Sequence, residues 1–127
     1  EKIRPDIICL PYGESYNQDH RATFKASIAA LRPIPRKLRH YVKTVLIYEE
    51  PYSWTVGDIF RPNIYLNTEK VEKEKVRLMK LHKSQDRPSP FSRSTDNLIS
   101  RMRLRGSDVG LKSAEAYILL RGSLEWG

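Results

Sequence analysis

The chain has 127 residues, which suffices for one modest domain, and 39% of them are hydrophobic, so a buried core is possible. Its net charge is +8, and no apolar run approaches the roughly 20 residues that a membrane helix needs. The single cysteine, Cys9, excludes an internal disulfide and fits a reducing compartment. Because Cys9 lies in an apolar run, we expect it in the core.

The first expected element is a strand from Asp6 to Leu10, a short apolar run of the kind that is buried on both faces of a parallel sheet. A polar loop with turn residues follows, and then a helix that Asp19 is expected to cap. Asn17, Asp19 and His20 therefore lie between the carboxyl end of a strand and the start of a helix. Ligands bind at this position in open α/β sheets.

A second buried strand is expected from Thr44 to Tyr48, which is rich in β-branched and apolar residues. Glu49 follows directly and is a candidate site residue, whereas Glu50 is expected to face solvent. The long loop after this strand carries Trp54. An aromatic side chain in such a loop either stacks on a sugar face or covers the sheet edge, and the sequence does not decide between these two roles.

The second half of the chain repeats the alternation of strands and helices. We expect a short strand at 63–66 and then a helix that Asn67 or Thr68 caps and that reaches about residue 82. A third helix is expected to begin at Ser94 or Thr95, with Gly106 as its C-cap. A last strand is expected at 114–120. Such alternation predicts a mostly parallel sheet, in which the first two strands are parallel neighbours. Three helices cannot cover both faces of this sheet, and there is no starting methionine, so we expect a fragment.

Basic residues cluster in a proline-containing loop, at Arg32, Arg36, Lys37 and Arg39. Such a cluster serves nucleic acid or another anionic partner, or it is an ordinary solvated surface. The sequence contains no zinc-finger, basic-zipper or ribonucleoprotein motif. We therefore treat a nucleic-acid-binding module as an alternative and expect no nucleic-acid partner.

The residues around His20 offer one imidazole and one carboxylate, fewer ligands than a zinc site requires. The order of motifs along the chain goes further, because four of them resemble those of the LmbE-like, or PIG-L, zinc-dependent N-deacetylases. The matching stretches are Pro5-Asp6-Ile7-Ile8 with Asn17-Gln18-Asp19-His20-Arg21, then Phe60-Arg61-Pro62-Asn63-Ile64-Tyr65-Leu66, Lys80-Leu81-His82-Lys83-Ser84-Gln85, and Arg105-Gly106-Ser107 with Gly110 and Ala114-Glu115-Ala116-Tyr117. Together they span nearly the whole chain.

This resemblance implies a Rossmann-like α/β domain with a mostly parallel sheet, of which residues 1–127 would be a single C-terminal part. It also implies a cytoplasmic hydrolase that removes an N-acetyl group from an amino-sugar conjugate with zinc. His20 matches a zinc ligand of the family, while the other ligands and the general base belong to an upstream motif that is absent from this sequence. A homo-oligomer is compatible with this interpretation, and the isolated chain is expected to be inactive.

Other residues are candidates for roles in such a site. Asn17 and Asp19 are candidate catalytic residues, Asn17 as an oxyanion donor and Asp19 either as an orienting group for His20 or simply as the helix cap. Candidate substrate-binding residues are Glu49, Trp54 and Arg61. The sequence departs from the family at Asn17, where many members have histidine, and at Ser113, where members often have tyrosine. The remaining alternative is a non-catalytic half-domain that completes its sheet with another chain.

Overall fold

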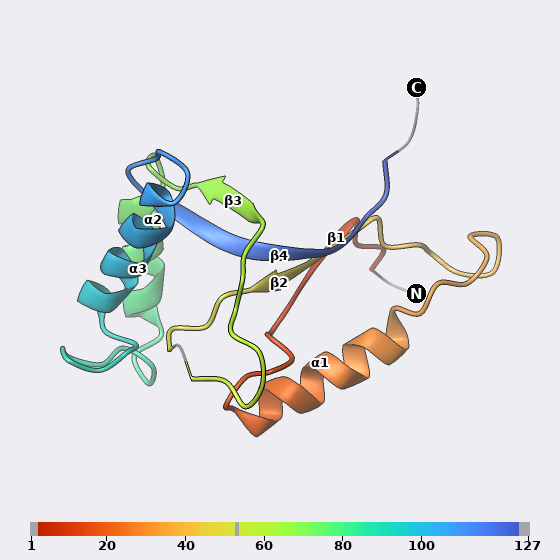
Figure 1. The fold of residues 1–127 in the computed structure, drawn as a ribbon, viewed down its shortest axis with the longest axis horizontal. Coiled ribbons are helices and arrows are strands. Elements are labelled where there is room, and N and C mark those ends of the chain that lie inside the picture. Colours follow the sequence, from red (N-terminus) through yellow and green to blue (C-terminus); the bar gives the residue numbers. More distant parts are fainter. Residues whose placement is uncertain (1–2, 53, 125–127) are drawn as a thin grey trace. The chain divides into compact units, whose positions relative to one another are not determined.

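The computed structural model describes residues 3–52 and 54–124. In chain order its elements are β1 (Ile7–Leu10), α1 (Gln18–Ala30), β2 (Thr44–Tyr48), β3 (Ile64–Asn67), α2 (Glu72–Leu81), α3 (Thr95–Ser107) and β4 (Ala114–Gly122) (Figure 1). The mixed α/β class that the sequence predicted is confirmed. Among the described residues, no helix has both the length and the apolar composition needed to cross a membrane.

The strands form one sheet in the order β1-β2-β4-β3. As predicted, β1 and β2 are parallel neighbours, with Ile7 opposite Thr44 and Leu10 opposite Ile47. β4 runs antiparallel to β2. The N–H of Asn63 donates to the carbonyl oxygen of Tyr117, and the N–H of Thr68 donates to that of Ser113. The partner's number falls as the chain advances, so β3 is antiparallel to β4. The described sheet is therefore mostly antiparallel rather than mostly parallel.

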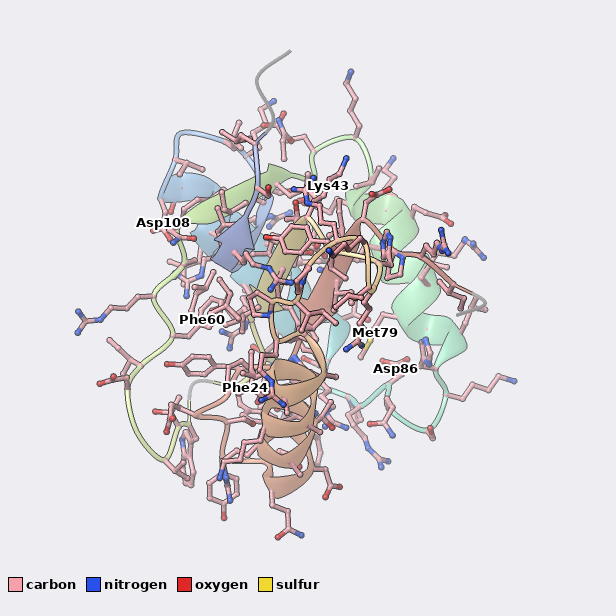
Figure 2. All side chains as sticks on the ribbon, turned by 90° about the vertical axis from the view of Figure 1, so that its right-hand side faces the viewer. Phe24, Lys43, Phe60, Met79, Asp86 and Asp108 are labelled. Carbon is pink, nitrogen blue, oxygen red and sulfur yellow. The ribbon has the colours of Figure 1, made fainter. Side chains whose placement is uncertain are left out.

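The chain divides into two compact units, and each has its own packing. The first comprises Glu1–Asn63 with Tyr117–Gly127, and its core is built on Leu10, Val42 and Val45. Three half-buried side chains pack against this core, Ile8, Phe24 and Leu31, and Figure 2 labels Phe24 on α1. Phe24 and Leu31 thus hold α1 and its C-terminal cap against this core, which fixes the start of α1 near the end of β1.

β1 is an edge strand, and this position explains a wrong prediction. Only Leu10 of its four residues is buried, while Ile7 is 58% exposed and Cys9 is also exposed. An edge strand has a neighbour on one side only, so an apolar run in it does not become buried unless something covers both faces. Cys9 is therefore a surface thiol and not a core residue.

The second unit, Ile64–Ala116, contains β3, α2, α3 and the first residues of β4. Ser94 caps α3 as expected, by accepting a hydrogen bond from the N–H of Asn97 at 3.2 Å. α2 begins only at Glu72, because Asn67 accepts the N–H of Glu69 and holds the preceding residues in turns. Gly106 is not a C-cap but lies within α3.

Candidate functional site

The polar site is built around the first turn of α1, and Asn17 caps this helix. Asn17 has extended backbone angles, and its Oδ1 atom accepts the N–H of Asp19 at 2.9 Å. The prediction that Asp19 is the cap was wrong, because a cap must precede the first helical residue and α1 begins at Gln18. The Asp19 side chain is exposed in the first turn, where a negative charge is favourable beside the helix N-terminus.

His20 projects from the same turn and forms a hydrogen bond with Glu50, which follows β2. The distance from His20 Nδ1 to Glu50 Oε1 is 2.6 Å. Glu50 is only 5% exposed, so the prediction that it faces solvent was wrong. β2 ends at Tyr48, and beyond that residue the alternation of a strand no longer decides which side chains point inward. Glu50 thereby becomes the partner of His20.

Ser15 completes a chain of three side chains. Its hydroxyl donates to Glu50 Oε2 at 2.7 Å and accepts the backbone N–H of Asn17 at 3.0 Å. Ser15 is 1% exposed, so this network is buried at one end and reaches solvent at His20, whose side chain is 28% exposed. A buried carboxylate needs such donors to offset its lost hydration.

The tautomer of His20 is assigned here for an ionised Glu50 carboxylate. An ionised carboxylate only accepts hydrogen bonds, so the proton between the two side chains belongs to His20 Nδ1. In the neutral imidazole the lone pair is then on Nε2, and no described residue bonds that atom. This arrangement suits two kinds of chemistry, metal ligation through Nε2 and acceptance of a proton at Nε2.

The same geometry excludes a serine-hydrolase triad made from these three residues. In such a triad the serine donates to the histidine, and the carboxylate binds the other side of the ring. Here Glu50 lies between Ser15 and His20, and Ser15 is buried. Ser15 therefore positions Glu50 and is not a nucleophile.

An exposed aromatic pair lies on the chain segments that adjoin this network. Trp54 and Tyr16 meet edge to face with ring centroids 5.8 Å apart, and they are 71% and 61% exposed. A backbone bridge between Ser15 and Thr55 holds the two segments together, and Arg21 donates to the carbonyl oxygens of Ser15 and Tyr16. Because Trp54 is so exposed, it does not serve to cover the sheet edge.

The structure places the other two candidate substrate-binding residues differently. Glu49 is half-buried beside Glu50 at the end of β2. Arg61 is exposed on the far part of the 51–62 loop. Burial raises the pKa of the Tyr12 phenol, and the charge of Arg61 opposes part of that rise. Within the described part of the chain, no hydrogen bond or ion pair connects Arg61 with His20 or Glu50.

Burial and charge also act on the tyrosine that ends β2. Burial raises the pKa of the Tyr48 phenol above its ordinary value, and the nearby Glu50 carboxylate raises it further. Tyr48 therefore stays neutral beside Glu50, and it adds no second negative charge at this end of the strand.

A zinc site needs three or four ligands, and the described residues contain no group of three His, Cys, Asp or Glu side chains placed to hold a metal. His20 fits one coordination position, because a carboxylate on Nδ1 is the usual partner of a histidine that binds metal through Nε2. The fit is therefore limited to one ligand, with Glu50 as its orienting group.

The sequence pointed to His20 and Asn17 but not to Glu50 and Ser15, which the structure joins to them by hydrogen bonds. The available signal was the position of Glu50 at the carboxyl end of a buried strand, the same criterion that selected Glu49.

Comparison of the chain with models of known protein families and with curated proteins finds no match.

Proposed function

We propose that this chain is part of a metal-dependent N-deacetylase, in which His20 ligates the metal, zinc, through Nε2. The observation that supports the proposal is the pairing of His20 Nδ1 with the buried Glu50 carboxylate. It holds the imidazole in the tautomer that a metal ligand requires. The choice of enzyme family depends on the resemblance of the motifs described above. That family has a Rossmann-like domain, and we propose that residues outside these 127 contribute the remaining metal ligands.

The bound zinc would polarise the amide carbonyl and supply a water of lowered pKa. The role of Asn17 follows from its cap geometry. Its Oδ1 atom is used by the Asp19 N–H, so its Nδ2 group is left as a donor at the start of α1, the turn that also carries His20. We assign this donor to the oxyanion of the tetrahedral intermediate. Asp19 contributes its charge at the helix start, and within the described part of the chain the side-chain hydrogen bond of His20 goes to Glu50.

The substrate class is an N-acetylated amino-sugar conjugate. Sugar rings present apolar faces that stack on aromatic side chains, and the exposed Tyr16 and Trp54 provide such a surface beside the Ser15 segment. Glu49 and Arg61 are further candidates for binding the hydroxyl groups or the conjugate. We place the enzyme in the cytoplasm, a reducing compartment that suits the exposed, unpaired Cys9.

A second candidate function is favoured by β1. This edge strand exposes Ile7 and Cys9, so a non-catalytic module could complete its sheet by pairing β1 with a strand of another chain. Hydrogen exchange distinguishes the candidates, since a pairing module gains protection at the β1 amides on association without any dependence on His20.

The test of the hydrolase combines metal content with acetate release from an N-acetylglucosamine conjugate, measured on the protein with its complete ligand set. His20→Ala should lose zinc and most turnover, and Glu50→Gln should weaken zinc affinity by about 10–100-fold. The exposed His82 provides a matched control, because His82→Ala should retain both properties. Full zinc content and activity in His20→Ala would refute the proposal.

Asn17 needs a variant that separates its two roles. Asn17→Asp keeps the oxygen that caps α1 but removes the Nδ2 donor, so we expect normal zinc binding with a rate lowered by about 10²–10³-fold. Asn17→His should keep activity, because many members of the family have histidine there. Equal rates for Asn17→Asp and the wild type would remove Asn17 from the oxyanion site.

A further inference from the structure

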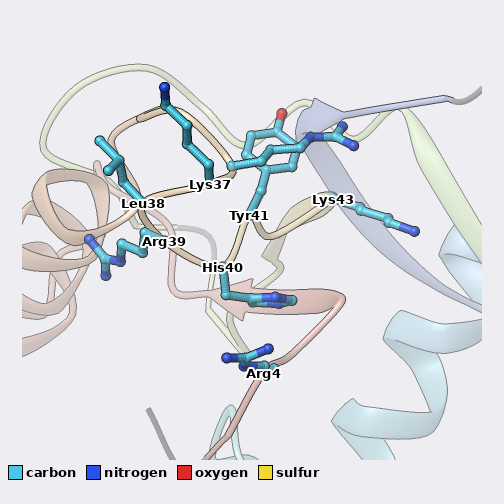
Figure 3. A pocket seen from close by; sticks show the side chains of 8 residues that line it. Arg4, Lys37, Leu38, Arg39, His40, Tyr41 and Lys43 are labelled. Carbon is cyan, nitrogen blue, oxygen red and sulfur yellow. The ribbon is translucent and has the colours of Figure 1, made fainter.

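A second polar site lies in the first unit, apart from the His20 network. It is a cavity of about 470 Å³ lined by five cationic side chains, Arg4, Arg36, Lys37, Arg39 and Lys43 (Figure 3). These residues come from the segment before β1 and from the loop between α1 and β2. Among the described residues that line the cavity there is no aspartate or glutamate.

Tyr41 and Arg121 support one wall of this cavity. The Arg36 guanidinium lies over the Tyr41 ring at 4.9 Å from its centroid, and Arg121 lies over the same ring at the same distance. Arg121 is fixed in turn by hydrogen bonds to the carbonyl oxygens of Leu31 and Val42, at 2.9 and 3.2 Å. Cation–π contacts of this kind restrict a long side chain, so Arg36 is held before any ligand arrives.

We propose that this cavity binds a small, soluble ligand that carries a diphosphate group. Five cationic side chains around one cavity suit a multiply charged anion better than a single carboxylate, and planar guanidinium groups match phosphate oxygens in pairs. The volume of about 470 Å³ is in the range of small-molecule sites and leaves room beyond the diphosphate itself.

An extended nucleic acid fits the cavity less well. Proteins that bind single strands stack successive bases on aromatic rings. The aromatic ring that lines this cavity belongs to Tyr41, and two guanidinium groups already occupy it. The observations therefore favour recognition of charge by a cluster of cations over recognition of bases along a groove.

The test measures binding of inorganic pyrophosphate to the 127-residue chain by titration calorimetry at fixed ionic strength. Lys37→Gln/Arg39→Gln removes two exposed cations of the cavity and should lower the affinity by roughly tenfold or more. The matched control, Lys25→Gln/Arg103→Gln, removes the same net charge at exposed positions of α1 and α3 and should bind like the wild type. Circular dichroism checks that both variants are folded.

Two results would overturn the proposal. One is equal loss of affinity in both double variants, which would show that pyrophosphate responds only to net charge. The other is absence of pyrophosphate binding by the wild type, including the case in which the chain binds mixed vesicles of phosphatidylcholine and phosphatidic acid instead. Neither result depends on zinc or on His20, so the outcome is separate from that of the proposed deacetylase.

Discussion

Glu50 connects two side chains that lie 30 and 35 positions away in the sequence, His20 and Ser15. Glu50→Ala would remove a buried acceptor and leave the Ser15 hydroxyl without its partner. We expect the free energy of unfolding to fall by about 2–4 kcal/mol, because hydrogen bonds to buried charges are costly to break on one side. Urea denaturation measures this loss.

The control for Glu50 is Asp19→Ala, which removes an exposed carboxylate from the same part of the fold. Its expected cost is below about 1 kcal/mol, the usual worth of a charge at a helix N-terminus. Similar costs for the two variants would contradict the buried network.

The raised pKa of Tyr48 predicts how the free energy of unfolding depends on pH in the alkaline range. Burial, and then the Glu50 charge, raise its pKa in the folded state above the value of the unfolded chain. The unfolded chain therefore loses this proton first as pH rises past about 10, and from there the free energy of unfolding decreases until the folded-state pKa is passed. Below that window the contribution of Tyr48 to stability is complete.

Tyr48→Phe should flatten this alkaline decrease in urea titrations, leaving the part that comes from Tyr12, whose pKa burial also raises. An unaltered alkaline slope in Tyr48→Phe would show that its proton does not contribute.

Single residues also show what the sequence could reveal of the site. The position of His20 in the first turn of a helix that follows a strand was predictable from the local pattern. Glu50 was not, because its burial depends on where the backbone turns after Tyr48, and on a serine from another loop. Local pattern determines which residues end a strand but not which of two adjacent carboxylates turns inward.

Within the elements, α3 offers a test of close packing. A Cβ atom added at Gly106 would lie 2.6 Å from the Leu111 carbonyl oxygen and 2.7 Å from the Ser113 nitrogen, both backbone atoms. Alanine is intrinsically the better helix former by about 1 kcal/mol. We nevertheless expect Gly106→Ala to destabilise the protein by about 1–3 kcal/mol, because backbone cannot move aside as a flexible side chain does.

Ser100→Ala provides the comparison for Gly106, since Ser100 is exposed in the same helix. It should be neutral or slightly stabilising in thermal denaturation. A stabilising effect of Gly106→Ala would mean that the turn after α3 can open without cost.

The extents of the elements were largely predictable. The strands near Ile7, Thr44 and Ala114 and the start of α3 at Thr95 agree with the apolar spacing and the capping serine. The direction of β4 was not predictable, because periodicity identifies a strand but not its orientation, and α2 and α3 both precede it. The prediction that β1 is buried was wrong for a related reason. A run of four residues does not indicate whether a strand lies at the edge or in the middle of its sheet.

For the whole molecule, the metal hypothesis makes a prediction about the chain alone. Its described residues supply one ligand of the expected kind, His20, and no cluster of three. We therefore expect the 127-residue chain to bind zinc weakly and to release no acetate from an N-acetylglucosamine conjugate. Titration with zinc against a chelator of known affinity measures this. A tight, stoichiometric site built from these residues alone would contradict it.

The Arg121 contacts bear on the order in which the molecule folds. Arg121 is separated by 90 residues from Leu31 and by 79 from Val42, the carbonyl groups that it binds. Contacts across such distances in the sequence form late, since the loop entropy is lost before they contribute. During synthesis on the ribosome, the end of α1 and the loop that carries Arg36 therefore become fixed only after β4, which contains Arg121, has been made. Trypsin should cleave the basic loop after α1 faster in a nascent chain stopped before β4 than in a chain from which Arg121 has emerged.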